Sequence, residues 1–317
     1  MTIRTLFRPL LPALSVLLSV VASAQLNITQ LGHLDYHASR NSDLSNLWGY
    51  VDDEGNEYAL VGVNGDPGVD NSGGFSVVNV NDPANPVEVF FTPGPNSIWR
   101  EIKTWGHYAY ITTEAEAGLT IVDLSPLPQS TDLPITVFQG NGWSTSHSLF
   151  IDENGRLYLN GSNRGNGGVI FYDLTQDPMA PVEVGQYDTY YVHDCFARGD
   201  TLYAAHIFDG FFTIVDVSDP ANPVITDSLM ANTRRINDIM TTPDGKYLVH
   251  TREGASDRKN GIVIASLEDP LHPKKIAEYT EGLTGGVHST FIYSQLKYGT
   301  HIYLTNDGTG YMHVIDI

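Results

Sequence analysis

Six residues that could do chemistry recur at one position of a repeated pattern, at intervals of 52, 47, 46, 44 and 51 residues. Three of them are histidines, and the next position holds three acidic side chains. The first column is Trp48, Arg100, His147, His193, Asn237 and His288. The second column is Gly49, Glu101, Ser148, Asp194, Asp238 and Ser289. Imidazole is a common ligand of transition metals, and three His with an open position match the ligand count of a catalytic zinc site.

The two columns therefore predict a metal or small-ligand site. A divalent ion there, Zn²⁺ or Ca²⁺, would acidify a bound water or polarise a substrate oxygen. The predicted metal ligands are His147, His193 and His288. The predicted ligand-binding residues are Trp48, Arg100 and Asn237. The candidates for a general base or for orienting the ligands are Glu101, Asp194 and Asp238.

A structural interpretation of the same residues stays open. A pseudo-symmetric ring of His, Asn and Asp side chains can also hydrogen-bond neighbouring strands and ordered water along a channel. In addition, ligands contributed by alternate repeats can lie too far apart for metal bonds of about 2.1 Å.

The elements that carry these columns are strands of an internal repeat. Similar segments begin at Phe75, Leu119, Val169, Phe212, Ile262 and His313, and most of them contain an IVD-like core. Short runs rich in Val, Ile, Tyr and Phe alternate with Gly, Pro, Asn and Asp, which is typical of strands and turns. Four strands in each repeat of about 45 residues predict the blade of a β-propeller. The first strand of a blade lines the central channel, so each column becomes a ring of side chains near one channel mouth.

The two ends of the chain indicate the number of blades. The sixth repeat stops after its third strand, whereas residues 27–37 resemble an orphan fourth strand. We expect this segment to pair with the strand around Met312 to Asp316, which would complete a six-bladed ring and remove an exposed sheet edge. The alternative is a sixth blade cut short, with residues 25–40 as a flexible leader.

Residues 1–24 resemble a secretory signal peptide, with Arg4 and Arg8 before an apolar run and Ala-Ser-Ala before Gln25. Residues 25–317 would then form a single propeller domain that is exported to the periplasm, the cell surface or the medium. Removing two Arg and no acidic residue takes the net charge from −20 to −22, which argues against nucleic acid as a partner. We expect a monomer without a transmembrane segment. The single Cys195 excludes an intramolecular disulfide and is expected to be a buried thiol.

Other polar residues are weaker candidates. His206 and His301 are expected to have hydrogen-bonded or solvated roles. The acidic loops at 66–70, 152–154 and 307–310 lack the spacing of an EF-hand and are expected to be turns. The aspartates that end the third strands are expected to bond the backbone of the following turn. They are Asp123, Asp173, Asp216 and Asp316.

Several segments resemble a known family. TIVDLSP, TIVDVSDPANPV and HVIDI are similar to the LVIVD repeat, and the segments from Asn46, Trp99 and Tyr191 resemble the secreted bacterial β-propellers of the choice-of-anchor B family. The resemblance covers nearly all of the chain after residue 24. It implies a propeller fold and export, and it implies little about biochemical activity. Members often carry a C-terminal anchoring segment, and this sequence ends at Ile317.

Two functions follow from these observations. The first is a non-catalytic secreted or surface propeller whose blade loops bind a protein, a glycan or a small molecule. The second is a metal-dependent hydrolase or lyase with its active site at the channel mouth. No nucleophile elbow, phosphate loop or His-Glu-x-x-His motif is present in the sequence.

Overall fold

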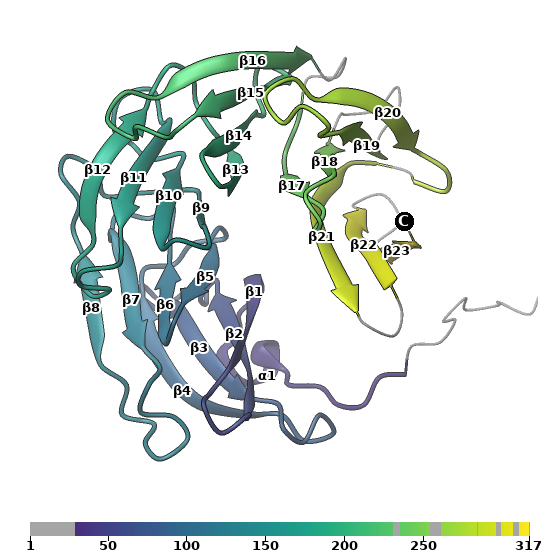
Figure 1. Ribbon diagram of the computed structural model, residues 1–317. Helices are drawn as coiled ribbons and strands as arrows, with labels where there is room; N and C mark the ends of the chain where they lie inside the picture. The colour runs from purple at the N-terminus through teal and green to yellow at the C-terminus, as the bar shows by residue number, and fades with distance from the viewer. Residues whose placement is uncertain are drawn as a thin grey trace, which may run out of the picture.

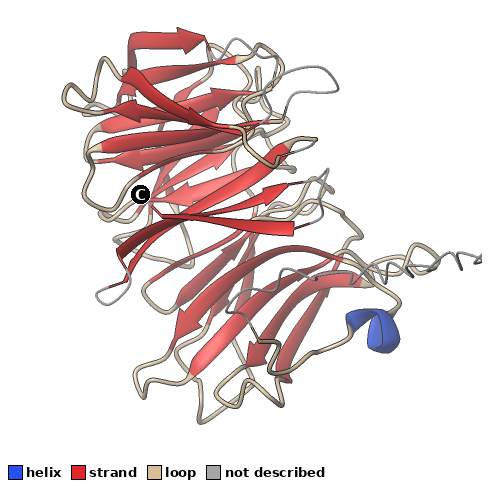
Figure 2. Ribbon diagram, turned by 90° about the vertical axis from the view of Figure 1, so that its right-hand side faces the viewer, coloured by secondary structure: helices blue, strands red, loops and turns tan. Residues whose placement is uncertain are grey.

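The protein is a ring of six antiparallel β-sheets, the arrangement of a six-bladed β-propeller (Figure 1). The computed structural model describes residues 29–230, 235–253, 261–283, 285–295, 299–306 and 311–316. Strands make up nearly all of the regular secondary structure, and the short helix α1 lies at the edge of the fold (Figure 2). The fold class predicted from the repeat is confirmed. None of the helices in the described ranges is long and apolar enough to cross a membrane.

Each blade is built from consecutive strands, with the first strand nearest the ring axis (Figure 1). Blade 1 contains β1 (Leu44–Val51), β2 (Glu57–Val63), β3 (Gly73–Asn79) and β4 (Val87–Gly94). Blade 2 contains β5 (Ile102–Trp105), β6 (Tyr108–Ile111), β7 (Leu119–Asp123) and β8 (Ile135–Phe138). Blade 3 contains β9 (Ser148–Ile151), β10 (Arg156–Asn160), β11 (Val169–Asp173) and β12 (Val182–Tyr187). Blade 4 contains β13 (Asp194–Arg198), β14 (Thr201–His206), β15 (Phe211–Asp216) and β16 (Val224–Met230). Blade 5 contains β17 (Ile239–Thr241), β18 (Tyr247–Arg252), β19 (Gly261–Ser266) and β20 (Lys274–Tyr279). Blade 6 contains β21 (Val287–Gln295), β22 (Gly299–Asn306) and β23 (Tyr311–Asp316).

The turns of the repeat use the residues that the sequence suggested. Asp123, Asp173 and Asp216 each accept a hydrogen bond at Oδ1 from the backbone N–H two residues later, at 2.8–2.9 Å. The predicted turn role of these three aspartates is confirmed. In blade 4 the tight hairpin between Arg198 and Thr201 places Gly199 at φ +55°, which glycine adopts without a steric penalty.

Apolar side chains pack between neighbouring blades. Tyr158, Phe171 and Val215 belong to a buried cluster shared by blades 3 and 4, and similar clusters join the other consecutive blades from blade 1 to blade 6. Cys195 lies buried in the same cluster between blades 3 and 4, and burial raises the pKa of its thiol. The thiol is therefore an inert part of the core, as expected.

The N-terminal segment packs on blade 1. Residues 29–35 form no strand, and α1 (Tyr36–Arg40) follows with Asp35 as its N-cap. The sheet of blade 6 contains three described strands, so the predicted pairing of the N-terminal segment with Met312–Asp316 is not among its ladders. Residues 27 and 28 of that prediction and residues 1–24, the predicted signal peptide, lie outside the described residues. The N-capping bonds of Asp35 favour a helical turn at this point over an extended ladder.

The N-terminal segment nevertheless contacts blade 1 in the way that the outer strand of one blade contacts the next blade in the ring. A Cβ atom on Gly32 would lie 2.2 Å from the Pro83 carbonyl oxygen, and one on Gly185 of β12 would lie 1.8 Å from that of Pro220 in blade 4. The Tyr36 hydroxyl lies 2.6 Å from Ser76 Oγ in β3. In the same way, the Tyr187 hydroxyl of β12 lies 3.1 Å from Thr213 Oγ1 in β15. The N-terminal segment thus contacts blade 1 as the outer strand of blade 3 contacts blade 4.

Candidate functional site

All residues of the first column except Trp48, which lies within β1, are found where the inner strands begin, at one end of the ring axis, which we call the mouth. His147 and His193 directly precede β9 and β13, and His288 is the second residue of β21. Hydroxyl groups of the preceding blade fix their backbone carbonyls. Thr112 Oγ1 donates to the His147 carbonyl at 3.2 Å, Ser148 Oγ to that of His193 at 2.7 Å, and Thr251 Oγ1 to that of His288 at 3.3 Å.

His147, His193 and Asp194 form the centre of the mouth. One potential ligand atom from each of the three lies within 4.8 Å of the other two. The two imidazole rings are 3.9 Å apart between centroids. His193 Nδ1 lies 3.0 Å from Asp194 Oδ2, and His147 Nδ1 lies 2.6 Å from Glu114 Oε1. Each imidazole is therefore oriented by a carboxylate at Nδ1.

The pKa values of two carboxylates near the axis, Asp194 and Asp238, are shifted in opposite directions. Burial disfavours the charge on both His193 and Asp194, yet their mutual hydrogen bond raises the pKa of His193 and lowers that of Asp194. Their hydrogen bond therefore favours the charged form of each side chain. Burial, together with the charge of Asp194, raises the pKa of Asp238 to about 7. Asp238 Oδ2 accepts the backbone N–H of Thr290 at 2.8 Å, which links blade 5 to blade 6.

Trp99 separates His288 from the other two histidines. Its indole stacks on the His288 ring at 5.7 Å between centroids and 7° between planes, and it lies 5.9 Å from the His147 ring. His288 Nδ1 lies 2.9 Å from Ser289 Oγ. The three-histidine arrangement predicted from the sequence is therefore replaced by two histidines and Asp194, with His288 beyond Trp99. Trp99 itself was missed, because it lies one residue before the repeating column.

Arg100 turns away from the axis. Its side chain is 6% exposed, Nε donates to the Val63 carbonyl at 3.1 Å, and Nη2 contacts the Pro95 carbonyl beyond the end of the outer strand β4. The predicted ligand-binding residue thus joins blades 1 and 2 in this structure. Burial without a carboxylate partner lowers the pKa of Arg100 to about 10.

Other column residues lie below the mouth along the axis. Glu101 forms an ion pair with Lys103, and Lys103 Nζ lies 4.4 Å above the Trp48 ring. Trp48 Nε1 donates to Thr104 Oγ1 at 3.0 Å. The Trp48 indole N–H and the Glu101 carboxylate are therefore both bonded to other side chains of the protein.

Asn237 stays at the mouth with an unused acceptor. Its side chain is 1% exposed and donates from Nδ2 to Glu253 Oε2 at 3.1 Å. In the described part of the chain, no group donates to Asn237 Oδ1. The Asn237 backbone carbonyl accepts a bond from His193 and helps to raise the pKa of that ring.

The weaker candidates have structural contacts. His206 bonds the Tyr191 carbonyl at 2.8 Å through Nδ1 and Thr213 Oγ1 at 3.0 Å through Nε2, so its predicted hydrogen-bonded role is confirmed. His301 lies 3.9 Å from Asp316. In the acidic loops, Asp66 and Asp152 accept backbone N–H groups of their own turns. The loop at 307–310 lies outside the described residues.

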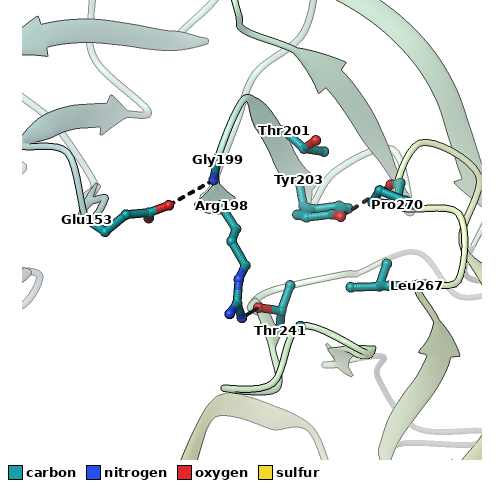
Figure 3. A pocket seen from close by; sticks show the side chains of 9 residues that line it. Glu153, Arg198, Gly199, Thr201, Tyr203, Thr241, Leu267 and Pro270 are labelled. Carbon is teal, nitrogen blue, oxygen red and sulfur yellow. Dashed lines mark hydrogen bonds between the residues drawn. The ribbon is translucent and has the colours of Figure 1, made fainter.

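A separate pocket of about 390 Å³ lies between blades 4 and 5, at the opposite ends of the inner strands (Figure 3). Arg198 points along it, and its guanidinium donates to the carbonyls of Thr242 and Pro243 at 2.9 and 2.8 Å. Glu153 accepts the Gly199 N–H at 3.0 Å. Both charged groups are therefore used to join the blades, and the sequence columns gave no signal for this pocket.

Comparison with known proteins supports the repeat and the fold. The LVIVD repeat model matches residues 99–128 and 191–231. No curated protein matches the chain. A protein proposed to be a 6-phosphogluconolactonase of Bacteroides uniformis is similar with a TM-score of 0.57 and 13% identity, covering 84% of this chain and 82% of that one.

Two further solved structures show how widely the fold is shared. The periplasmic gluconolactonase of Pseudomonas aeruginosa has a TM-score of 0.58 and 8% identity, covering 86% of this chain and 85% of its own. A chain of the mitotic checkpoint complex has a TM-score of 0.65 and 10% identity, covering 90% and 79%. Identities this low support the fold alone. The chain is a six-bladed β-propeller that carries LVIVD repeats.

Proposed function

We propose that this protein is an exported binding propeller whose mouth holds a cation, with a divalent transition metal such as Zn²⁺ as the simplest occupant. The observation that carries the proposal is the group of His147, His193 and Asp194, whose potential ligand atoms lie within 4.8 Å of one another. Two imidazoles and a carboxylate are a donor set that suits Zn²⁺.

The surroundings of this group support the proposal. Glu114 bonds His147 Nδ1, which leaves Nε2 of that ring as the atom available to an ion. A carboxylate on the far nitrogen of a ligating His is the usual outer partner at zinc sites, where it fixes the ring and its tautomer. His288 lies beyond Trp99 and is not needed for this donor set.

Zinc titration of the purified protein tests the proposal. We expect about one Zn²⁺ per chain by calorimetry, and a loss of at least tenfold in affinity in His147→Ala and in His193→Ala. His288→Ala is the matched control, since it removes another imidazole of the first column that lies outside the group of His147, His193 and Asp194. Equal losses in all three variants would favour the three-histidine site, and no uptake by the native protein would exclude a zinc site.

A metal-dependent hydrolase or lyase is the second candidate. One protein with the same fold is a proposed 6-phosphogluconolactonase and another is named a periplasmic gluconolactonase, which suggests sugar lactones as the first substrates to assay. Asp194 would hold the ion, and Glu101 and Asp238 are the other predicted candidates for a general base. Lactone hydrolysis that requires Zn²⁺ and disappears in His147→Ala would establish this function.

Export from the cytoplasm is part of the proposal. The signal-like residues 1–24 and the resemblance to choice-of-anchor B propellers support export. N-terminal sequencing of the protein recovered outside the cytoplasm should begin at Gln25. A mature protein that begins at Met1 would contradict export by this route.

A further inference from the structure

We infer that Tyr191 is a ligand-binding residue of the mouth, and that its hydroxyl group donates a hydrogen bond to a small oxygen ligand of the proposed metal ion. This inference rests on the proposed site of His147, His193 and Asp194, and it names the class of ligand as a monoanionic oxygen donor, such as a hydroxamate or a carboxylate. It draws on the fixed position of the Tyr191 ring and on the lack of a described partner for its hydroxyl group.

The ring of Tyr191 lies against two glycines of the loop between β10 and β11. A Cβ atom on Gly167 would lie 2.8 Å from the ring atom Cδ2, and one on Gly161 would lie 2.9 Å from the hydroxyl oxygen. Gly161 has a φ of +61° and Gly167 a φ of +73°, which glycine adopts without a steric penalty. The two glycines therefore make room for the aromatic side chain.

Contacts on both sides of Tyr191 hold it in this place. The Val192 N–H donates to the Gly167 carbonyl at 3.0 Å, and His206 Nδ1 lies 2.8 Å from the Tyr191 carbonyl oxygen. Phe208 contacts the Tyr191 ring at 5.2 Å between centroids. A side chain that is already held loses little freedom when a ligand arrives, so a new hydrogen bond from its hydroxyl group adds directly to affinity.

The hydroxyl group of Tyr191 borders the proposed metal site. The Cβ position on Gly161 that lies 2.9 Å from this oxygen also lies 2.8 Å from His147 Cβ, so the side chains of Tyr191 and His147 are neighbours. Burial raises the pKa of Tyr191 to about 12, and the charges of Glu114 and Asp194 add to the rise. These are the two carboxylates that bond the imidazoles of His147 and His193.

Packing accounts for the ring of Tyr191 but not for its hydroxyl group. Among the described residues, no group forms a hydrogen bond with this hydroxyl. By contrast, the hydroxyl groups of Tyr187 and Tyr203 bond Thr213 Oγ1 and the Pro270 carbonyl. A phenylalanine would pack against the same two glycines, so the phenol is left with a donor for a ligand.

The donor set of the proposed site indicates which ligand this hydroxyl group would meet. Two imidazoles and Asp194 supply three of the four ligands of a zinc ion and leave one position open. The Asp194 carboxylate cancels only one of the two charges of Zn²⁺, so an anion is favoured at the open position. A hydroxyl group beside that position stabilises a charged oxygen, because hydrogen bonds to charged groups are the stronger ones.

Calorimetry of the zinc-loaded protein tests the inference with two probes. Acetohydroxamate binds zinc through oxygen, whereas imidazole binds through nitrogen and then offers no acceptor to Tyr191. We expect Tyr191→Phe to weaken acetohydroxamate binding about tenfold or more and to change imidazole binding less than about twofold. Tyr190→Phe is the matched control, because it removes the hydroxyl group of the adjacent residue, whose ring packs on His206 and Phe211.

The outcomes separate this inference from the proposed function. Unchanged acetohydroxamate affinity in Tyr191→Phe, or zinc uptake by the native protein without acetohydroxamate binding, overturns the inference and leaves the metal site intact. Equal losses for acetohydroxamate and imidazole also overturn it, because they would show that Tyr191 only maintains the shape of the mouth. Failure of the native protein to bind Zn²⁺ overturns the proposed function and this inference together.

Discussion

Tyr36 offers the sharpest test of how the ring is held together. Its side chain is 5% exposed, and its hydroxyl lies 2.6 Å from Ser76 Oγ in β3 of blade 1. Leu34 and Tyr36 together cover a face of blade 1 that includes Val61, Val63 and Val78. If the N-terminal segment is an integral part of the ring, removing this side chain should destabilise the whole protein and not only its end.

The magnitude follows from the contacts. Tyr36→Phe removes one buried hydrogen bond and should cost about 1 kcal/mol of unfolding free energy. Tyr36→Ala also removes a buried aromatic ring and should cost about 3–5 kcal/mol. Tyr187→Phe in blade 3 is the matched control, since its hydroxyl bonds Thr213 at the equivalent place, and it should cost the same as Tyr36→Phe.

Urea denaturation followed by circular dichroism measures all three variants. Deleting residues 25–36 should lower the midpoint at least as far as Tyr36→Ala does. The blade 6 contacts Trp48–Phe291 and Trp99–His288 cross to blades 1 and 2, so Tyr36→Ala should also weaken Zn²⁺ binding at the mouth. An unchanged midpoint in Tyr36→Ala would refute the view that this segment acts as the missing outer strand.

Three further outcomes are expected from buried polar groups. Burial raises the pKa of Asp238 to about 7, so the folded state keeps a proton that the unfolded state loses. The free energy of unfolding should therefore fall as pH rises from about 4 to 7. Urea midpoints of Asp238→Asn should vary less across that range. Burial lowers the pKa of His250 to about 4. Its contribution to the free energy of unfolding is therefore present above about pH 6.5 and is lost as the pH falls toward 4. Thermal melts of His250→Gln should depend less on pH in the acid range. Ser148→Ala removes the bond to the His193 carbonyl and the acceptor of Asn160 Nδ2, and it should cost about 1–3 kcal/mol in denaturant titrations. A wild-type pH dependence in either of the first two variants, or an unchanged midpoint in the third, would contradict the assigned contacts.

The repeat was sufficient to predict the blades and the position of most column residues near the starts of the inner strands. An IVD-like core and a turn aspartate define each third strand, and Asp123, Asp173 and Asp216 make the expected turn bonds. Periodicity reports backbone position, and side chains at equivalent backbone positions lie at equivalent depths in a symmetric ring. His147 and His193 could therefore be placed side by side from their spacing alone.

The direction of each side chain could not be predicted in the same way. Arg100 shares its column with His147 but is long enough to reach the carbonyls of Val63 and Pro95 away from the axis. Trp99 precedes the column in a connection whose length varies between blades, so no period marks it. The closure of the ring shows a similar limit, because Asp35 caps a helix where the pattern of residues 27–37 suggested a strand.

The structure also narrows the choice between a structural ring and a binding site. Bonds between neighbouring inner strands use the backbone carbonyls of His147, His193 and His288, with Thr and Ser hydroxyls as the donors. Any residue at these three positions would supply the same carbonyl, and of the three imidazoles only that of His193 also bonds a neighbouring inner segment, at the Asn237 carbonyl. Packing does not explain the imidazoles either, since each ring places Nδ1 against a carboxylate or a hydroxyl group. The rings of His147 and His288 are therefore not required for the contacts between inner strands, which supports the proposed role of the mouth in ligand binding.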